Sequence, residues 1–131
     1  MTRTLTGSCL CGGVVYELSG DIDDIVTCHC AQCRKTTGHH VAATRTAREN
    51  CRLIKDDTLQ WYRSSPEAQR GFCQTCGGQL FWQADASPNI SVHAGTLDTP
   101  TGLKTRCHIY VADKGDYYEL EDGLPQYAQE D

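Results

Sequence analysis

Short stretches in which apolar and polar residues alternate, separated by turn-forming residues, recur along the whole chain. Residues 14–18 are one example, because Gly12-Gly13 precedes them and Ser19-Gly20-Asp21 follows them. Such a pattern is typical of half-buried β-strands joined by tight turns. Further strands are predicted over residues 41–46, 59–63, 79–83, 90–94, 105–112 and 117–120.

Helical periodicity is weak throughout the sequence. No segment keeps a 3.6-residue apolar period for three turns, and the one helical turn that we predict follows Cys30, over residues 31–36. The sequence has no internal repeat, low-complexity stretch or linker. The pattern therefore predicts a mainly β protein, with many short strands in a single domain over residues 1–131.

Composition narrows the classes of partner. The 131 residues carry a net charge of -5, and Lys and Arg form no cluster, which disfavours a nucleic-acid partner because phosphate binding needs a concentrated basic face. No window approaches the roughly 20 apolar residues of a membrane helix, so no membrane association is expected. The N-terminal residues lack the apolar stretch of a signal peptide, and we expect a cytoplasmic protein.

Nine cysteines are the main chemical feature of the chain, and cytoplasmic thiols stay reduced, so their spacing points to metal or catalysis rather than disulfides. Seven of them fall into three groups with sulfurs two or three residues apart, close enough to share one ion. The groups are Cys9-Leu10-Cys11, Cys28-His29-Cys30-Ala31-Gln32-Cys33 and Cys73-Gln74-Thr75-Cys76. Zinc favours such thiolates in a tetrahedron, so the sequence predicts zinc binding.

Ligand counting suggests two zinc sites of different kinds. Cys9, Cys11, Cys73 and Cys76 would complete one closed, structural site that joins segments more than sixty residues apart. The remaining triplet of Cys28, Cys30 and Cys33 would leave one coordination position open, as catalytic zinc does. Spacing alone leaves alternatives, since the triplet could borrow Cys73, or a histidine could close the second site. The candidate histidines are His29, His39 and His40.

The three cysteine motifs, taken in order, resemble those of a known family. The motifs are Cys9-Leu10-Cys11-Gly12, the stretch from Cys28 to Gly38, and Phe72-Cys73-Gln74-Thr75-Cys76-Gly77. The tail matches at Ala94-Gly95-Thr96-Leu97-Asp98, His108-Ile109-Tyr110-Val111 and Gly123-Leu124-Pro125. Over about residues 5–127 the chain thus resembles the glutathione-dependent formaldehyde-activating enzyme family, which shares its domain with centromere protein V.

This resemblance implies a zinc-stapled β-tent fold of short antiparallel strands. It implies two Zn²⁺ ions per chain, a structural one on Cys9, Cys11, Cys73 and Cys76, and a catalytic one on Cys28, Cys30 and Cys33. The family reaction joins glutathione and formaldehyde into S-hydroxymethylglutathione or splits that adduct, which is carbon–sulfur lyase chemistry. The expected partners are therefore a small glutathione-like thiol and an aldehyde.

Charge favours thiol activation over carbonyl polarisation at the open site. Three thiolates on Zn²⁺ give a net charge of -1 and a fourth gives -2, so the ion is a poor Lewis acid but holds a reactive thiolate. Arg34 and Lys35 follow the last ligand and are candidates to compensate this charge and to contact the carboxylates of glutathione. The alternative for both residues is a role as solvated surface cations.

Two other functions remain open at this level. One is a non-catalytic zinc module that binds a partner, although the acidic end Gln129-Glu130-Asp131 lacks the basic tail expected of a chromatin-binding member. The other is a redox enzyme that reduces methionine sulfoxide, which would need Cys51 or Cys107, the two cysteines outside the motifs. Lone cysteines are more often small buried hydrophobes, and His108 is interpreted as a structural, hydrogen-bonded residue.

Overall fold

The computed structural model of the protein describes residues 3–130, in which ten strands and one α-helix form. The strands are β1 (Leu5–Ser8), β2 (Val15–Leu18), β3 (Ile25–Cys28), β4 (Val41–Ala47), β5 (Cys51–Lys55), β6 (Leu59–Ser65), β7 (Ala68–Cys73), β8 (Gln79–Ala84), β9 (Asn89–His93) and β10 (Thr105–Ile109). The helix α1 covers Ala31–Thr37, and short 3-10 helices cover Arg48–Asn50, Ala94–Thr96 and Val111–Asp113. The predicted mainly β fold is therefore confirmed.

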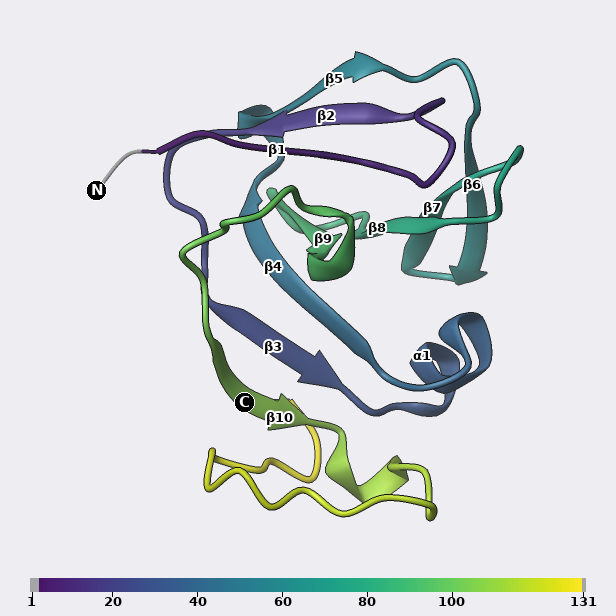
Figure 1. Ribbon diagram of the computed structural model, residues 1–131. Helices are drawn as coiled ribbons and strands as arrows, with labels where there is room; N and C mark the ends of the chain where they lie inside the picture. The colour runs from purple at the N-terminus through teal and green to yellow at the C-terminus, as the bar shows by residue number, and fades with distance from the viewer. Residues whose placement is uncertain (1–2, 131) are drawn as a thin grey trace.

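The strands form two sheets (Figure 1). A three-stranded sheet has the order β1-β2-β5, and a seven-stranded sheet has the order β10-β3-β4-β9-β8-β7-β6. Every pairing is antiparallel except that of β10 with β3, which is parallel. The parallel pair joins segments distant in the sequence, so β10 lies beside the strand that leads into the cysteine triplet.

The hydrophobic core lies where the small sheet covers the large one. Tyr16 and Leu18 from β2 are fully buried, as are Leu80, Phe81 and Val92 from β8 and β9. The rings of Tyr16 and Phe81 pack edge to face with centroids 5.3 Å apart, a favoured aromatic geometry. Such burial contributes about 1.5–3 kcal/mol for each large side chain, so the core holds the two sheets together.

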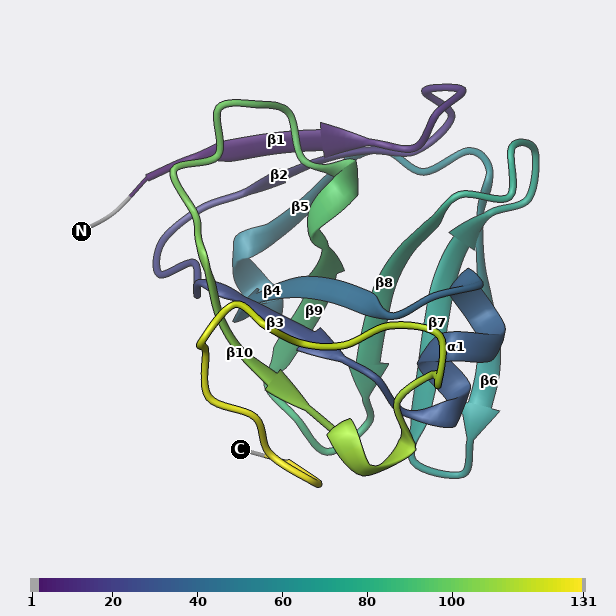
Figure 2. The same cartoon turned by 60° about the horizontal axis from the view of Figure 1, so that its bottom comes forward.

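The segment after β10 returns along the same strand, as Figure 2 shows at the yellow end of the chain. The backbone N–H of Tyr127 donates to the carbonyl oxygen of His108 at 2.9 Å, and the N–H of His108 donates to Pro125 at 3.0 Å. Figures 1 and 2 both place α1 beside the β6–β7 side of the large sheet. The triplet motif therefore lies between the large sheet and the tail.

Most of the predicted elements form, with shifted ends. The six strands predicted between residues 14 and 112 correspond to β2, β4, β6, β8, β9 and β10, and the predicted helical turn is α1. Four strands had not been predicted, namely β1, β3, β5 and β7. Within residues 3–130, no helix has the length and the apolar character needed to span a membrane.

The prediction of a strand over residues 117–120 was wrong, and β10 ends at Ile109 instead of at residue 112. Tyr117 and Tyr118 lie in a loop, where their hydroxyl groups hydrogen-bond to His39 and His29 instead of packing in a sheet. Tyr110 has a φ of 55°, in the left-handed region, which ends the strand and begins the 3-10 turn. Side-chain hydrogen bonding thus overrides the alternating pattern at this end.

Candidate metal centres

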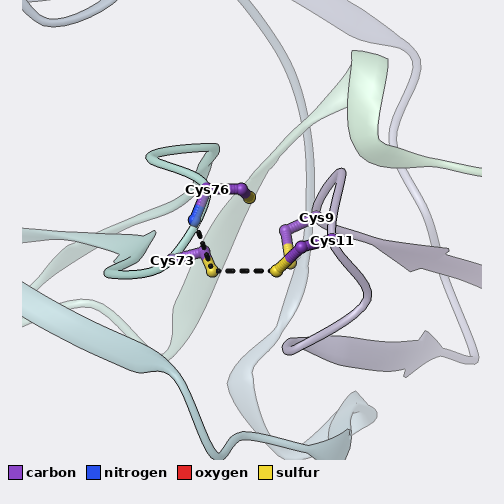
Figure 3. A group of neighbouring side chains, drawn as sticks. All are labelled: Cys9, Cys11, Cys73 and Cys76. Carbon is purple, nitrogen blue, oxygen red and sulfur yellow. Dashed lines mark hydrogen bonds between the residues drawn. The ribbon is translucent and has the colours of Figure 1, made fainter.

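The first cysteine cluster joins the two sheets (Figure 3). Cys9 and Cys11 lie in the turn between β1 and β2 of the small sheet, Cys73 ends β7 of the large sheet, and Cys76 follows in the turn to β8. The four sulfur atoms all lie within 4.8 Å of one another. The cluster therefore sits where a shared ion would hold the N-terminal hairpin against the β7–β8 hairpin.

The sulfur separations in this first cluster fit a tetrahedral ion. The Sγ atoms of Cys9 and Cys11 are 3.7 Å apart, and those of Cys11 and Cys73 are 3.6 Å apart. A tetrahedron with zinc–sulfur bonds of about 2.3 Å has sulfur–sulfur edges of roughly 3.8 Å. The side chains are thus already arranged as a four-thiolate zinc site requires.

Local backbone geometry directs donors at these sulfurs. Gly77 has a φ of 76°, which lets the chain turn back so that the N–H of Cys76 donates to the sulfur of Cys73 at 3.4 Å. The hydroxyl of Thr58 lies 3.1 Å from the same sulfur. The Thr58 hydroxyl and the Cys76 amide lower the pKa of the Cys73 thiol to about 6, so this thiol ionises readily, as a metal ligand must.

The second cluster is formed where β3 runs into α1. Cys28 is the last residue of β3, Cys30 is the N-cap of α1, and Cys33 lies on the buried side of that helix. Their sulfurs lie within 4.8 Å of one another, and the described residues bring no fourth cysteine, histidine or carboxylate into the group. The division into four and three ligands that was expected from the sequence is therefore also a division in space.

The three thiols of the second cluster affect one another strongly. Hydrogen bonds from the thiols of Cys28 and Cys33 lower the pKa of Cys30, whereas the neighbouring thiols raise the pKa of Cys28. In the absence of a cation, negative charge on one sulfur opposes ionisation of the next. A bound divalent cation removes this conflict, so the thiol set fits a metal centre.

Arg70 is a residue of this site that the sequence did not indicate. It lies in β7, its side chain is only 3% exposed, and its Nη2 atom lies 3.9 Å from the sulfur of Cys33. Arg34 and Lys35, the two cations that the sequence indicated, directly follow Cys33 on α1. Arg34 donates from Nε to the carbonyl oxygen of Asp113 at 3.0 Å, and Lys35 is exposed.

A buried polar network flanks the second cluster on the side of the tail. His29, fully buried between two of the cysteines, bonds through Nδ1 to the hydroxyl of Tyr118 and through Nε2, at 3.0 Å, to Thr27. The hydroxyl of Thr27 also bonds to His108, which reaches Asp122 at 2.8 Å. Since both ring nitrogens of His29 have partners, this histidine does not serve as a fourth ligand here, and His108 is hydrogen-bonded as expected.

The remaining candidate residues lie outside the two cysteine clusters. His39 bonds through Nδ1 to the hydroxyl of Tyr117 at 2.7 Å, and the ring of His40 lies against that of His29. Cys51 is half-buried in β5, where burial raises its thiol pKa to about 11, and Cys107 is buried in β10. A thiol with so high a pKa is a weak nucleophile at neutral pH, which disfavours Cys51 as a redox centre.

His93, at the end of β9, makes stability depend on pH. Burial and then the positive charge of Arg70 lower its pKa to about 4, so the unfolded chain takes up the proton first as the pH falls. The contribution of neutral His93 is complete above the ordinary pKa of 6.5 and is lost as the pH falls from 6.5 towards 4. The expected loss is about 3 kcal/mol in the free energy of unfolding.

Urea unfolding of the wild type and of His93→Gln between pH 7 and pH 4 checks this expectation. The metal ligands are the same in both proteins, so acid release of metal cancels in the difference. The wild type should lose more stability than the variant across this interval, and parallel curves would show that His93 is not the cause.

The fold and the two cysteine clusters define a small β protein with two candidate metal centres, and comparison with known proteins agrees. The family model described as glutathione-dependent formaldehyde-activating enzyme matches residues 4–113. The chain therefore belongs to this family, as the order of its cysteine motifs had indicated. None of the curated proteins matches the sequence.

A solved structure shares the fold. It is the crystal structure of a Rhodobacter sphaeroides protein determined as a structural genomics target, with a TM-score of 0.58 and 20% sequence identity. The alignment covers 93% of this chain and 98% of the other. The similarity extends over almost the whole of both chains, so the arrangement of sheets described above is that of a known fold.

Proposed function

We propose that the protein is a zinc-dependent carbon–sulfur lyase that forms or splits the adduct of a small thiol and an aldehyde, as in S-hydroxymethylglutathione. The observation that carries the proposal is the separation of seven cysteines into a cluster of four and a cluster of three. A four-thiolate site is coordinatively complete, whereas a three-thiolate site keeps room for a substrate. Membership of the family supplies the reaction class.

In this proposal the two centres have different tasks. Cys9, Cys11, Cys73 and Cys76 hold a structural zinc ion between the two sheets. Cys28, Cys30 and Cys33 would hold a second zinc ion, whose positive charge would favour the thiolate form of a substrate thiol. Arg34 and Lys35, at the end of α1, are the proposed contacts for the carboxylates of a glutathione-like thiol.

The reaction needs no oxidant or reductant. The sulfur of the thiol attacks the carbonyl carbon, a carbon–sulfur bond forms, and the proton given up by the thiol ends on the former carbonyl oxygen. The reverse direction breaks the same bond and returns the proton. The thiol therefore has to be kept ionised and aligned, and the cation that Cys28, Cys30 and Cys33 would hold would supply the positive charge that this requires.

The pairing of β3 with both neighbours keeps this site in place. Cys28 lies opposite Ile109 of β10 and Val41 of β4, and the N–H of His29 donates to the carbonyl oxygen of Ile109 at 3.0 Å. Because Cys28 is on a strand inside the sheet, its thiol keeps a fixed position as substrate enters and leaves. We expect both substrates to be small molecules, and we expect the protein to act in the cytoplasm.

Exchange spectroscopy by NMR tests the proposed reaction. Isotope-labelled formaldehyde and glutathione at equilibrium with their adduct should interconvert faster when zinc-loaded protein is added. The control is the same protein after a mild chelator has removed the more accessible ion. Exchange at the uncatalysed rate with glutathione and with other small thiols, such as cysteine, would contradict the proposal.

A further inference from the structure

Arg70 is a cation in a place where a cation is costly. Its side chain is 3% exposed. In the large sheet, Arg70 of β7 lies opposite Tyr62 of β6 on one side and Trp82 of β8 on the other. Removing a charge from water costs several kcal/mol unless an anion and hydrogen-bond partners replace the water. The groups that surround a buried arginine therefore indicate which anion balances its charge.

No carboxylate pairs with Arg70 among residues 3–130. The Nη2 atom contacts the amide oxygen of Gln32 at 3.4 Å and the sulfur of Cys33 at 3.9 Å, and Nε has no hydrogen-bond partner. The one group in this set that becomes an anion is the thiol of Cys33. The guanidinium of Arg70 thus contacts the second cysteine cluster and pairs with no acidic residue among those described.

The contact between Arg70 and Cys33 changes the net charge of the second centre. Three thiolates and one Zn²⁺ ion have a net charge of -1, and a buried guanidinium brings the total to zero. Binding a fourth, exogenous thiolate then takes the centre to -1 instead of -2. We propose that Arg70 is a positioning residue of the second centre, where its guanidinium offsets the charge of the thiolates and so favours both the metal ion and an incoming thiolate.

This proposal rests on the proposed zinc site at Cys28, Cys30 and Cys33, and it goes beyond it by naming what keeps that site charge-balanced. Arg34 and Lys35 are nearer in sequence to Cys33, but Lys35 is exposed and the Nε of Arg34 donates to Asp113. Exposed charges act weakly because water and salt screen them. Arg70 acts from within the sheet, where screening is weakest.

The test measures metal affinity at the second centre. The first centre is kept filled with zinc, Co²⁺ is added to the second, and its affinity is read by chelator competition and by the thiolate-to-cobalt absorption band. Arg70→Met and Arg70→Gln should each weaken Co²⁺ binding at least tenfold, and Arg70→Lys should recover most of the affinity. Arg52→Met, which removes an equal charge at an exposed position of β5 in the small sheet, should stay within about twofold of the wild type.

These outcomes separate the inference from the function on which it rests. Equal affinities in the wild type and both neutral variants would overturn the role of Arg70 while leaving the second centre intact. If Arg70→Lys bound as weakly as Arg70→Met, packing rather than charge would be responsible. Failure of the wild type itself to take up a second ion would overturn the proposed metal site and the inference together.

A thiol titration adds a second readout that does not depend on turnover. Glutathione and 2-mercaptoethanol are added to the cobalt-loaded protein, and the change in the absorption band is followed. If the charge of the centre matters, both neutral variants should lose affinity for both thiols in the same proportion. Loss for glutathione alone would assign Arg70 to the carboxylates of the ligand and would contradict the proposal.

Discussion

A Cys73→Ser substitution is expected to unfold the protein. Cys73 is fully buried at the end of β7, and its sulfur contacts Cys11 at 3.6 Å across the junction between the sheets. Structural zinc sites of this kind contribute about 10–16 kcal/mol of apparent binding free energy, which equals or exceeds the roughly 5–15 kcal/mol stability of an ordinary domain. A chain that loses the four-thiolate site has little stability left.

Circular dichroism and the zinc content of the purified variant measure this effect. Cys51→Ser is the matched control, because Cys51 is a half-buried cysteine in β5 outside both clusters. The control should fold and keep its zinc. A Cys73→Ser variant that melts cooperatively near the temperature of the wild type would show that the first cluster is not the structural site.

The second large effect is expected at Cys30. A Cys30→Ser variant should stay folded but lose the second zinc ion, and lyase activity should fall on the order of 100-fold or more. Cys30 is the N-cap of α1, where its sulfur accepts from the N–H of Cys33 at 3.4 Å. Serine is among the best N-cap residues, so the helix should be preserved while the metal ligand is lost.

Metal content, melting temperature and exchange rate should be measured on the same preparation of Cys30→Ser. The expected result is one zinc ion per chain, a melting temperature close to that of the wild type and exchange near the uncatalysed rate. Unfolding of this variant would mean that the assignment of structural and catalytic roles to the two clusters is wrong.

The sequence predicted the cysteine clusters well because their chemistry is local. Cys9 with Cys11 and Cys73 with Cys76 are each close in the chain, and the structure brings the two pairs within 4.8 Å. A strand with apolar residues at alternate positions, such as β9, was also predicted. The spacing of nearby cysteines and the alternation of apolar residues can be read from the sequence without knowledge of the fold.

Arg70 was missed because its meaning depends on contacts far along the chain. The strand β7 has no clear alternation of apolar and polar residues, and nothing in its sequence shows that Arg70 meets α1, 37 residues earlier at Cys33. The partners of His29 were missed for the same reason, since Tyr118 lies 89 residues later. Long-range pairing of polar side chains leaves no periodic signal in one sequence.

The proposed account depends most directly on how many zinc ions the chain binds and how tightly it holds each of them. Native mass spectrometry of freshly purified protein, before and after a mild chelator, gives both quantities at once. Two zinc ions per chain, one removed by the chelator and one retained, is the predicted result. One tightly held ion, with the triplet of Cys28, Cys30 and Cys33 empty or oxidised, would contradict the catalytic centre and favour a non-catalytic zinc-binding module.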